Sequence, residues 1–195
     1  VEEMASASLT LPEAGYDAVH LCGHYPKENV CAKDTLGQGR FCITSTRGET
    51  GHSDNPFLAL TEKNATEEQG EVYAFSLLYS GSFAIVTERA YNETVRINLG
   101  IASETFRWLL EPGEYLDTPY AVLLYTGAGL GGLTRAFHRL WKDALIPQKW
   151  VHTPRPLLIN SWEAVLFDFD DEKLLEFARS AKDLGMEMLV MDDGW

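Results

Sequence analysis

The sequence predicts a mainly β protein. We expect a β-sandwich over residues 1–126, a helical linker over 127–154 and a strand–helix–strand unit over 155–195. Three observations support this organisation. Short apolar runs recur between turn signals up to about residue 126, as they do in sandwiches. The apolar spacing becomes helical after Gly127. Two apolar runs with a helix between them then form a βαβ unit.

The strands and loops of the β-rich part follow from its apolar runs and turn residues. Residues 72–87 contain a hairpin candidate with Gly81 at the turn. Further strands are expected at 94–101, 105–110 and 120–125, with a turn at 111–114. The polar stretches 46–55 and 64–70 are expected to be loops.

The second part of the chain is expected to be helical and then βαβ. Apolar residues from Leu133 to Leu145 share one helical face, and Pro147 stops that helix. A strand at 156–160 and a strand at 186–191 flank a helix at 171–184. Asp170 or Asp171 caps this helix, Gly185 follows its end, and its inward face is formed by Leu174, Ala178 and Ala181. A (β/α)₈ barrel needs about 250 residues, so this unit is at most the start of one.

The charge balance argues against several kinds of partner. With 16 basic and 29 acidic residues, the formal net charge is −13. A nucleic acid or an anionic membrane would require a basic face, so we expect neither as a partner. No apolar run approaches the roughly 20 residues of a membrane span. The sequence begins at Val1 without a signal peptide and looks cut from something longer; a cytoplasmic location is favoured.

Three cysteines occur, at positions 22, 31 and 42. An odd count excludes a complete disulfide framework. Cys22 and His24, with Cys31 and Cys42, could be drawn as a zinc site, but their spacings match no standard pair. Free cysteines in strands and loops are the expectation, and no metal or other cofactor is predicted.

Two motifs compete for a functional interpretation. The run Gly127-Ala128-Gly129-Leu130-Gly131-Gly132 fits the dinucleotide fingerprint, which places pyrophosphate at a helix N-terminus. However, the fingerprint should open a βαβ unit, and a proline-containing linker follows instead. The alternative is a flexible connection between the sandwich and the helix.

The second motif is Asp168-Phe169-Asp170, which resembles the strand-end Asp-x-Asp of the haloacid-dehalogenase phosphatases, where Mg²⁺ bridges to phosphate. That family expects Gly-Thr after the second Asp, whereas this chain has Asp171-Glu172. The alternative is a helix N-cap with acids near the positive end of the helix dipole.

The most informative residues follow the last apolar run. Asp192-Asp193-Gly194-Trp195 come directly after a predicted buried strand, where ligands sit in barrels and open α/β sheets. Asn160-Ser161-Trp162-Glu163 follow the neighbouring strand. Adjacent carboxylates are costly to bury without a partner, although Asp-Gly is also a common turn. Acids and tryptophans at two neighbouring strand ends indicate a sugar pocket.

Several ordered motifs together resemble the α-galactosidases of glycoside hydrolase family 36. They are Leu21-Cys22-Gly23-His24; Arg47-Gly48 with His52 and Asn55-Pro56-Phe57; Tyr79-Ser80-Gly81-Ser82-Phe83; Glu111-Pro112-Gly113-Glu114; Phe137-His138-Arg139; Asn160-Ser161-Trp162-Glu163; and Met191-Asp192-Asp193-Gly194-Trp195. The resemblance covers nearly the whole chain. It implies a supersandwich-like N-terminal domain, a (β/α)₈ barrel and a retaining hydrolase for melibiose- or raffinose-type oligosaccharides.

The resemblance also implies roles for individual residues. Asp192 and Asp193 would hold hydroxyls of the terminal galactose, O4 and O6 above all, and Trp162 would shape the same pocket. The nucleophile and the acid/base would be aspartates on later barrel strands, beyond Trp195, so the chain alone would be inactive. Tetrameric members wall a neighbour's pocket with an N-terminal loop, which makes Arg47 and His52 accessory candidates. Trp195, at the end of the Asp192-Asp193-Gly194-Trp195 motif, is a third accessory candidate. Here Gly51 precedes His52 where a Ser is usual, which leaves the accessory specificity open.

The alternatives are a non-catalytic carbohydrate-binding sandwich and an α-N-acetylgalactosaminidase of the same family. A Mg²⁺ phosphatase or an NAD-binding protein is more remote.

Overall fold

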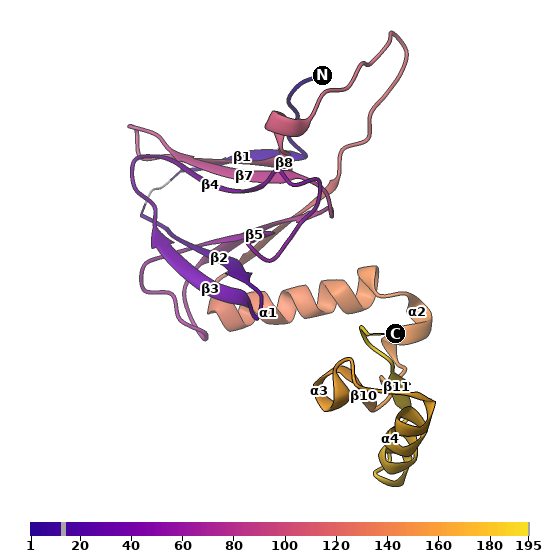
Figure 1. The fold of residues 1–195 in the computed structure, drawn as a ribbon. Coiled ribbons are helices and arrows are strands. Elements are labelled where there is room, and N and C mark those ends of the chain that lie inside the picture. The colour runs from indigo at the N-terminus through magenta and orange to yellow at the C-terminus, as the bar shows by residue number, and fades with distance from the viewer. Residues whose placement is uncertain (13–14, 195) are drawn as a thin grey trace. The chain divides into compact units, whose positions relative to one another are not determined.

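The computed structural model describes residues 1–12 and 15–194. By its internal contacts the chain divides into two units, Val1–Arg139 and Leu140–Trp195, and each is described by itself. Strands dominate the first unit, and helices are longer than strands in the second (Figure 1).

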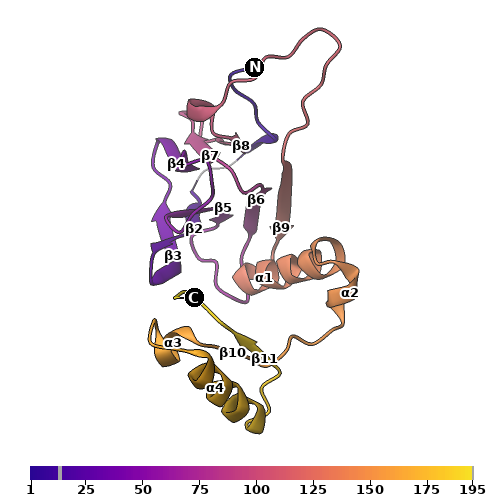
Figure 2. The ribbon, with the colours of Figure 1, turned by 45° about the vertical axis from the view of Figure 1, so that its right-hand side comes forward.

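Two antiparallel sheets form the first unit. One has the strand order β1 (Ala7–Leu11), β8 (Val95–Ile101), β7 (Phe83–Arg89) and β4 (Gly39–Ser45). The other has the order β3 (Lys27–Thr35), β2 (Asp17–His24), β5 (Asp54–Thr61), β6 (Val72–Leu78) and β9 (Tyr120–Thr126). Figure 2 shows β6 and β9 side by side at one edge of the second sheet. The predicted sandwich is therefore confirmed.

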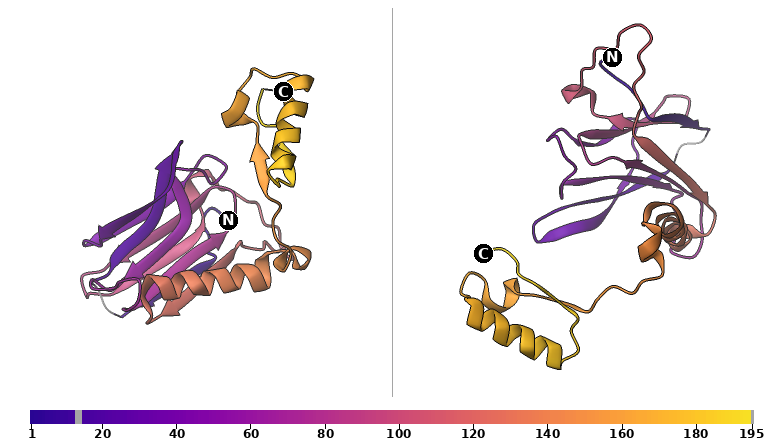
Figure 3. Two further views of the ribbon diagram at one scale, coloured as in Figure 1. Left: turned by 90° about the horizontal axis from the view of Figure 1, so that it is seen from below. Right: turned by 90° about the vertical axis from the view of Figure 1, so that its right-hand side faces the viewer.

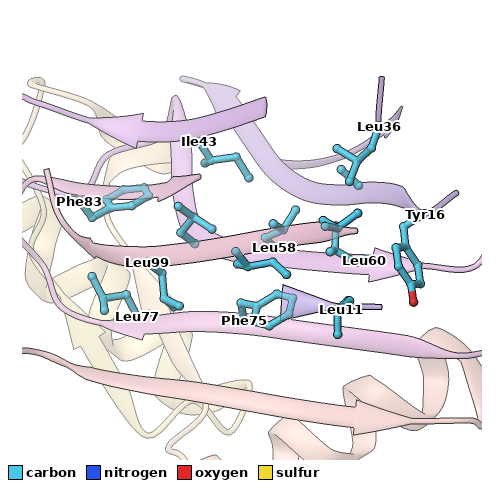
Figure 4. Packing of buried hydrophobic residues seen from close by; sticks show 14 residues of the cluster. Leu11, Tyr16, Leu36, Ile43, Leu58, Leu60, Phe75, Leu77, Phe83 and Leu99 are labelled. Carbon is cyan, nitrogen blue, oxygen red and sulfur yellow. The ribbon is translucent and has the colours of Figure 1, made fainter. Parts of the chain in front are cut away.

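The core of the first unit lies between the two sheets. Alternate residues point inward along each strand, because successive side chains of a strand face opposite sides. In β7, Phe83 and Ile85 are fully buried, whereas Ala84 and Val86, which alternate with them, are only partly buried. Leu58, Phe75 and Leu77 meet them from the second sheet (Figure 4).

The predicted hairpin at residues 72–87 is wrong. Its two strands, β6 and β7, lie in different sheets: β6 pairs with β5 and β9, and β7 pairs with β4 and β8. The segment around Gly81 crosses from one sheet to the other. Both strands present large apolar residues, Phe75 and Phe83 among them, to the common core, as the strands of a hairpin within one sheet would also do.

The predicted strand at 105–110 is also wrong. A short helix, η1 (Ser103–Thr105), is followed by an extended segment. Trp108 exchanges backbone hydrogen bonds with Val1 at 2.9 and 2.7 Å, and Leu109 is 80% exposed. Trp108 and Leu109 are residue types that suit a strand, but no sheet in the described part of the chain pairs with them. The predicted turn that follows is confirmed by the bond from Glu114 N–H to the Glu111 carbonyl.

The linker helix begins at α1 (Gly129–Leu140) and continues as the π-helical turn η2 (Trp141–Leu145). It ends before Pro147, as predicted, and the short helix α2 (Gln148–Val151) follows. Leu133 and Phe137 are buried on the predicted apolar face. The Phe137 ring meets Phe57 of β5 edge-on at 5.8 Å, so α1 packs on the outer face of the second sheet.

The second unit contains the predicted βαβ arrangement. Strand β10 (Leu158–Asn160) pairs in parallel with β11 (Met188–Val190). The short helix α3 (Trp162–Val165) and the longer α4 (Asp171–Asp183) connect them. Figure 3 shows α4 running beside the strands. Asp170 caps α4 by accepting from the Lys173 N–H at 2.9 Å, and Gly185 takes a φ of +84° beyond its end, as predicted.

Candidate functional site

The carboxyl ends of β10 and β11 lie at the same edge of their sheet. The strands run parallel, with Asn160 opposite Val190. The residues that follow the two strands are therefore brought together. We call Asn160, Ser161, Trp162, Asp192 and Asp193 the strand-end cluster.

Asn160 joins the two halves of the strand-end cluster. Its Nδ2 donates to Oδ2 of Asp192 at 2.5 Å, and its Oδ1 accepts from the backbone N–H of Trp162 at 2.8 Å. One amide thus contacts both the carboxylate and the first turn of α3. The sequence placed Asp192 and Trp162 at neighbouring strand ends, and the structure connects them through this side chain.

Ser161 fixes the backbone of the strand-end cluster. It is fully buried, and its N–H donates to the Val190 carbonyl at 3.0 Å. Its Oγ accepts from the Asp192 N–H at 3.1 Å. These two bonds hold the chain after β10 against the chain after β11, so the positions of Asp192 and Trp162 are coupled.

The Asp192 carboxylate is held in its charged form. The hydrogen bond from Asn160 is the main cause of a lowered pKa for this carboxyl group. The Asp193 N–H donates to Oδ1 at 2.6 Å and lowers the pKa further. Desolvation raises the pKa but is the smaller effect. Each carboxylate oxygen can accept about two hydrogen bonds. Each oxygen of Asp192 therefore retains acceptor capacity after its bond within the protein. Asp193 accepts from the Gly194 N–H at Oδ1, 2.9 Å away.

Trp162 and the turn at Asp192–Gly194 are linked by a second contact. The Trp162 indole meets the Phe167 ring edge-on, with centroids 5.0 Å apart. Gly194 has a φ of +97°, and a Cβ there would lie 2.9 Å from Phe167. A glycine is thus required where the turn passes the Phe167 ring. Trp195, an accessory candidate from the sequence, lies outside the described residues.

The other two accessory candidates belong to the first unit. Arg47 donates from Nη2 to Ser53 Oγ at 3.1 Å, and His52 is exposed in the same loop. Arg47 and Ser53 help to line a cavity of about 130 Å³ with Asp54 at its wall. Burial raises the pKa of Asp54 above its usual value, and attraction to His20 and Arg47 opposes the rise.

The glycine run Gly127–Gly132 was expected to be a flexible connection if it did not bind a nucleotide. The structure shows instead an ordered helix start. Helix α1 begins within the run, and its first N–H groups donate to a neighbouring loop: Gly129 to Gly70, Leu130 to Thr66 and Gly131 to Glu67, at 3.1, 2.9 and 2.9 Å. Backbone carbonyls therefore occupy the groups that a pyrophosphate would use. A Cβ at Gly129 would lie 2.3 Å from the Thr66 carbonyl oxygen, so the glycines permit close packing.

The Asp168-Phe169-Asp170 segment lacks the context of a phosphatase motif. No strand leads directly into Asp168, because the residues just before it form α3 and a loop in which Leu166 has a φ of +52°. Asp168 forms an ion pair with Lys173 Nζ at 2.8 Å, and Asp170 caps α4. Both carboxylates thus support the start of α4, as the alternative to a phosphatase motif predicted.

The cysteines do not converge. All three are free; Cys22 lies on β2, Cys31 on β3 and Cys42 on β4. Among residues 1–12 and 15–194, no three His, Cys, Asp or Glu side chains are grouped as a metal site would require. None of the helices in that part of the chain is both long and apolar enough to span a bilayer.

The sequence did not indicate a role for Asn160 or Ser161 in the strand-end cluster. Both were expected only as polar residues at the end of a strand. The available signal was their position at the end of an apolar run. The run was expected to be buried, but β10 is only partly buried, with Leu158 49% exposed. Ser161 is the residue that is fully buried, and buried polar groups are almost always hydrogen-bonded.

Comparisons with known proteins agree along the whole chain. Residues 1–111 match the glycosyl hydrolase family 36 N-terminal domain, and residues 115–195 match the melibiase domain. The α-galactosidase AgaA of Geobacillus stearothermophilus is 43% identical over 97% of this chain and 26% of its own length. The α-galactosidase Mel36A of Lactobacillus acidophilus is 36% identical over the entire chain and 27% of its own length.

Solved structures give the same result. The crystal structure of AgaA superimposes on all of this chain with a TM-score of 0.96 at 42% identity, and an α-galactosidase from Lactobacillus brevis does so with 0.95 at 39%. The chain spans about a quarter of the length of these relatives. Because the first family model alone covers more than half of the chain and agrees with its fold, the chain belongs to glycoside hydrolase family 36.

Proposed function

We propose that the whole protein is a retaining α-galactosidase that releases terminal α-linked galactose from melibiose- or raffinose-type oligosaccharides. Relatives that match the entire chain bear the name α-galactosidase. Variants of AgaA have been crystallised with raffinose and with stachyose. The observation that carries the proposal for this chain is the strand-end cluster, in which an ionised Asp192 keeps acceptor capacity on both oxygens beside Trp162.

In this proposal the chain binds and orients the sugar. Asp192 and Asp193 accept hydrogen bonds from galactose hydroxyls, O4 and O6 in particular, and the Trp162 indole shapes the pocket. Retention requires two carboxyl groups about 5–5.5 Å apart, one that attacks the anomeric carbon and one that first donates and then removes a proton. Both are assigned to later barrel strands outside these residues. The contribution of this chain is the correct placement of the reacting bond.

The domain organisation forms part of the proposal. Residues 1–126 form the sandwich domain, 127–154 the linker, and 155–195 the start of the (β/α)₈ barrel. The whole protein is proposed to be a homotetramer, in which the loop that carries Arg47 and His52, together with Trp195, contributes to substrate specificity. Size-exclusion chromatography with light scattering tests the tetramer directly.

The decisive experiment is hydrolysis by the whole protein. It should cleave a nitrophenyl α-galactoside and raffinose, and proton NMR should show α-galactose as the first product. Replacing Asp192 or Asp193 by Asn turns one hydrogen-bond acceptor into a donor, so kcat/KM should fall by about 10- to 100-fold or more. Asp183→Asn, at an exposed position in the last turn of α4, is the matched control and should be silent.

Three outcomes would contradict the assignment. Faster cleavage of an α-N-acetylgalactosaminide would favour that activity of the family. Galactose binding without any turnover would favour a non-catalytic sandwich. Near-normal kinetics for both Asp192→Asn and Asp193→Asn would remove these residues from the pocket.

A further inference from the structure

We propose that Asn160 is a positioning residue for Asp192: its side-chain amide sets the rotation of the carboxylate that receives the galactose hydroxyls. This inference rests on the proposed function for its meaning in catalysis. Its structural basis lies wholly within the second unit.

The orientation of the Asn160 amide follows from its two neighbours. The backbone N–H of Trp162 can only donate, so the amide atom that faces it must be the oxygen. The amide NH₂ then faces Asp192, which as an ionised carboxylate can only accept. Both ends of the amide thus have a complementary partner, and the opposite orientation would place donor against donor and acceptor against acceptor.

Asn160 is needed because, within the part of the chain that the structure describes, the other bonds to Asp192 do not fix the rotation of its carboxylate. Ser161 Oγ fixes the backbone N–H of Asp192 but not its side chain. The N–H of Asp193 contacts Oδ1 alone. The terminal torsion of an Asp side chain is soft, with a broad distribution. The bond from Asn160 to Oδ2 supplies the second point that defines the carboxylate plane.

Two substitutions separate the two bonds of the Asn160 amide. Asn160→Ala removes both. Asn160→Asp keeps an acceptor for the Trp162 N–H but places a carboxyl group against the Asp192 carboxylate. Two carboxylates in contact share a proton, which raises one pKa of the pair. While the pair holds that proton, residue 160 donates an O–H to Asp192 and imitates the amide. Once the proton is lost at higher pH, the two charges repel and the arrangement breaks.

The pH profiles of the two variants should therefore differ. Two measurements are made on the whole protein between about pH 4 and 8. Calorimetry gives the affinity for 1-deoxygalactonojirimycin, which an AgaA variant binds in a crystal. Hydrolysis of a nitrophenyl α-galactoside gives kcat/KM. Relative to the unmodified protein, Asn160→Ala should bind about 10-fold more weakly at every pH, because a misplaced group costs orientation. Asn160→Asp should match the unmodified protein at the acid end and lose about 10-fold at the alkaline end.

Controls and a structural measurement make the test decisive. Asn64→Ala and Asn64→Asp repeat the same chemical changes in an exposed loop of the first unit and should be silent. A crystal structure of Asn160→Ala should show the Asp192 carboxylate rotated from its present position. An unrotated carboxylate, or parallel pH profiles for the two Asn160 variants, would overturn the proposal. If the unmodified protein neither binds nor cleaves galactosides, the proposed function fails, and the crystal structure still decides whether Asn160 positions Asp192.

Discussion

Replacing Gly129 by alanine should destabilise the first unit strongly. Gly129 starts α1 with a φ of +65°, a conformation that costs an L-residue roughly 1–2 kcal/mol. The added Cβ would lie 2.3 Å from the Thr66 carbonyl oxygen and 2.7 Å from the Gln69 nitrogen, both backbone atoms. The loop would have to move by about an ångström, because ordinary carbon contacts lie near 3.5–4.0 Å.

That movement would weaken the three hydrogen bonds from the start of α1 to the loop carbonyls. Each such bond is worth about 0.5–1.5 kcal/mol net. With the conformational strain, the expected loss is about 3 kcal/mol, a large share of the roughly 5–15 kcal/mol that stabilises a typical domain. Urea unfolding followed by the circular dichroism of the strands measures this loss.

Two further variants separate strain from contact. A Cβ at Gly131 would meet the Glu67 carbonyl oxygen at 2.6 Å without a positive φ, so Gly131→Ala tests the contact alone. Gly113 has a φ of +91° and no neighbour within 4 Å, so Gly113→Ala tests the strain alone and should cost about 1 kcal/mol. If Gly129→Ala costs no more than Gly113→Ala, the loop does not pack rigidly on α1 and the reasoning fails.

Three other predictions concern Asp17, the start of α4 and metal dependence. Asp17 is buried; burial alone would raise its pKa, but hydrogen bonds from Thr35 and Lys33 lower it overall. Its charged form therefore stabilises the fold above about pH 4, and this contribution is lost as the pH falls through the lowered value. Asp17→Asn should lower the free energy of unfolding by about 1 kcal/mol at pH 7 and should not change it in strong acid. Urea unfolding at both pH values measures this, and an equal loss at low pH would refute the prediction. Asp170→Ala should lower the free energy of unfolding by about 1 kcal/mol, because the N-cap of α4 is lost. Asp168→Asn removes only an exposed ion pair and should leave the urea midpoint unchanged. Equal losses for the two variants would contradict the assignment of Asp170 as the cap. In the proposed α-galactosidase, two carboxyl groups cleave the glycosidic bond, so EDTA should not affect hydrolysis of an α-galactoside by the whole protein. Inactivation by EDTA that Mg²⁺ restores would instead support the metal-dependent phosphatase hypothesis.

The sequence predicted the elements of this chain better than their partners. Residues 72–87 were expected to hold the two strands of a hairpin with Gly81 at the turn, and strands β6 (Val72–Leu78) and β7 (Phe83–Arg89) lie there. Alternation shows that one face of a strand is buried, but it does not say which strand lies beside it. Phe75 and Phe83 satisfy the pattern equally well in one sheet or in two facing sheets, so the choice between a hairpin and a crossing depended on tertiary packing.

The strand-end cluster was predictable to a different degree. Parallel pairing after a βαβ unit requires the two strand ends to meet, and this was enough to bring Asp192 near Trp162. The linking roles of Asn160 and Ser161 depend on side-chain direction and on a buried N–H that only the folded chain defines. Residue type and spacing do not encode these contacts, so the sequence alone indicated the location of the cluster but not its internal bonding.

The glycine run and the strand-end acids show what separates a resemblance from a site. Both match known patterns, and both lie at an element end where backbone or side-chain polar groups could meet a ligand. At the start of α1, the N–H groups of Gly129, Leu130 and Gly131 already donate to loop carbonyls, so binding an anion there would require those bonds to break. Among residues 1–12 and 15–194, Asp192 has one bond on each oxygen and can accept another on each without losing any. Remaining hydrogen-bonding capacity in the folded state therefore favours the strand-end cluster, and it does so independently of the family to which the chain belongs.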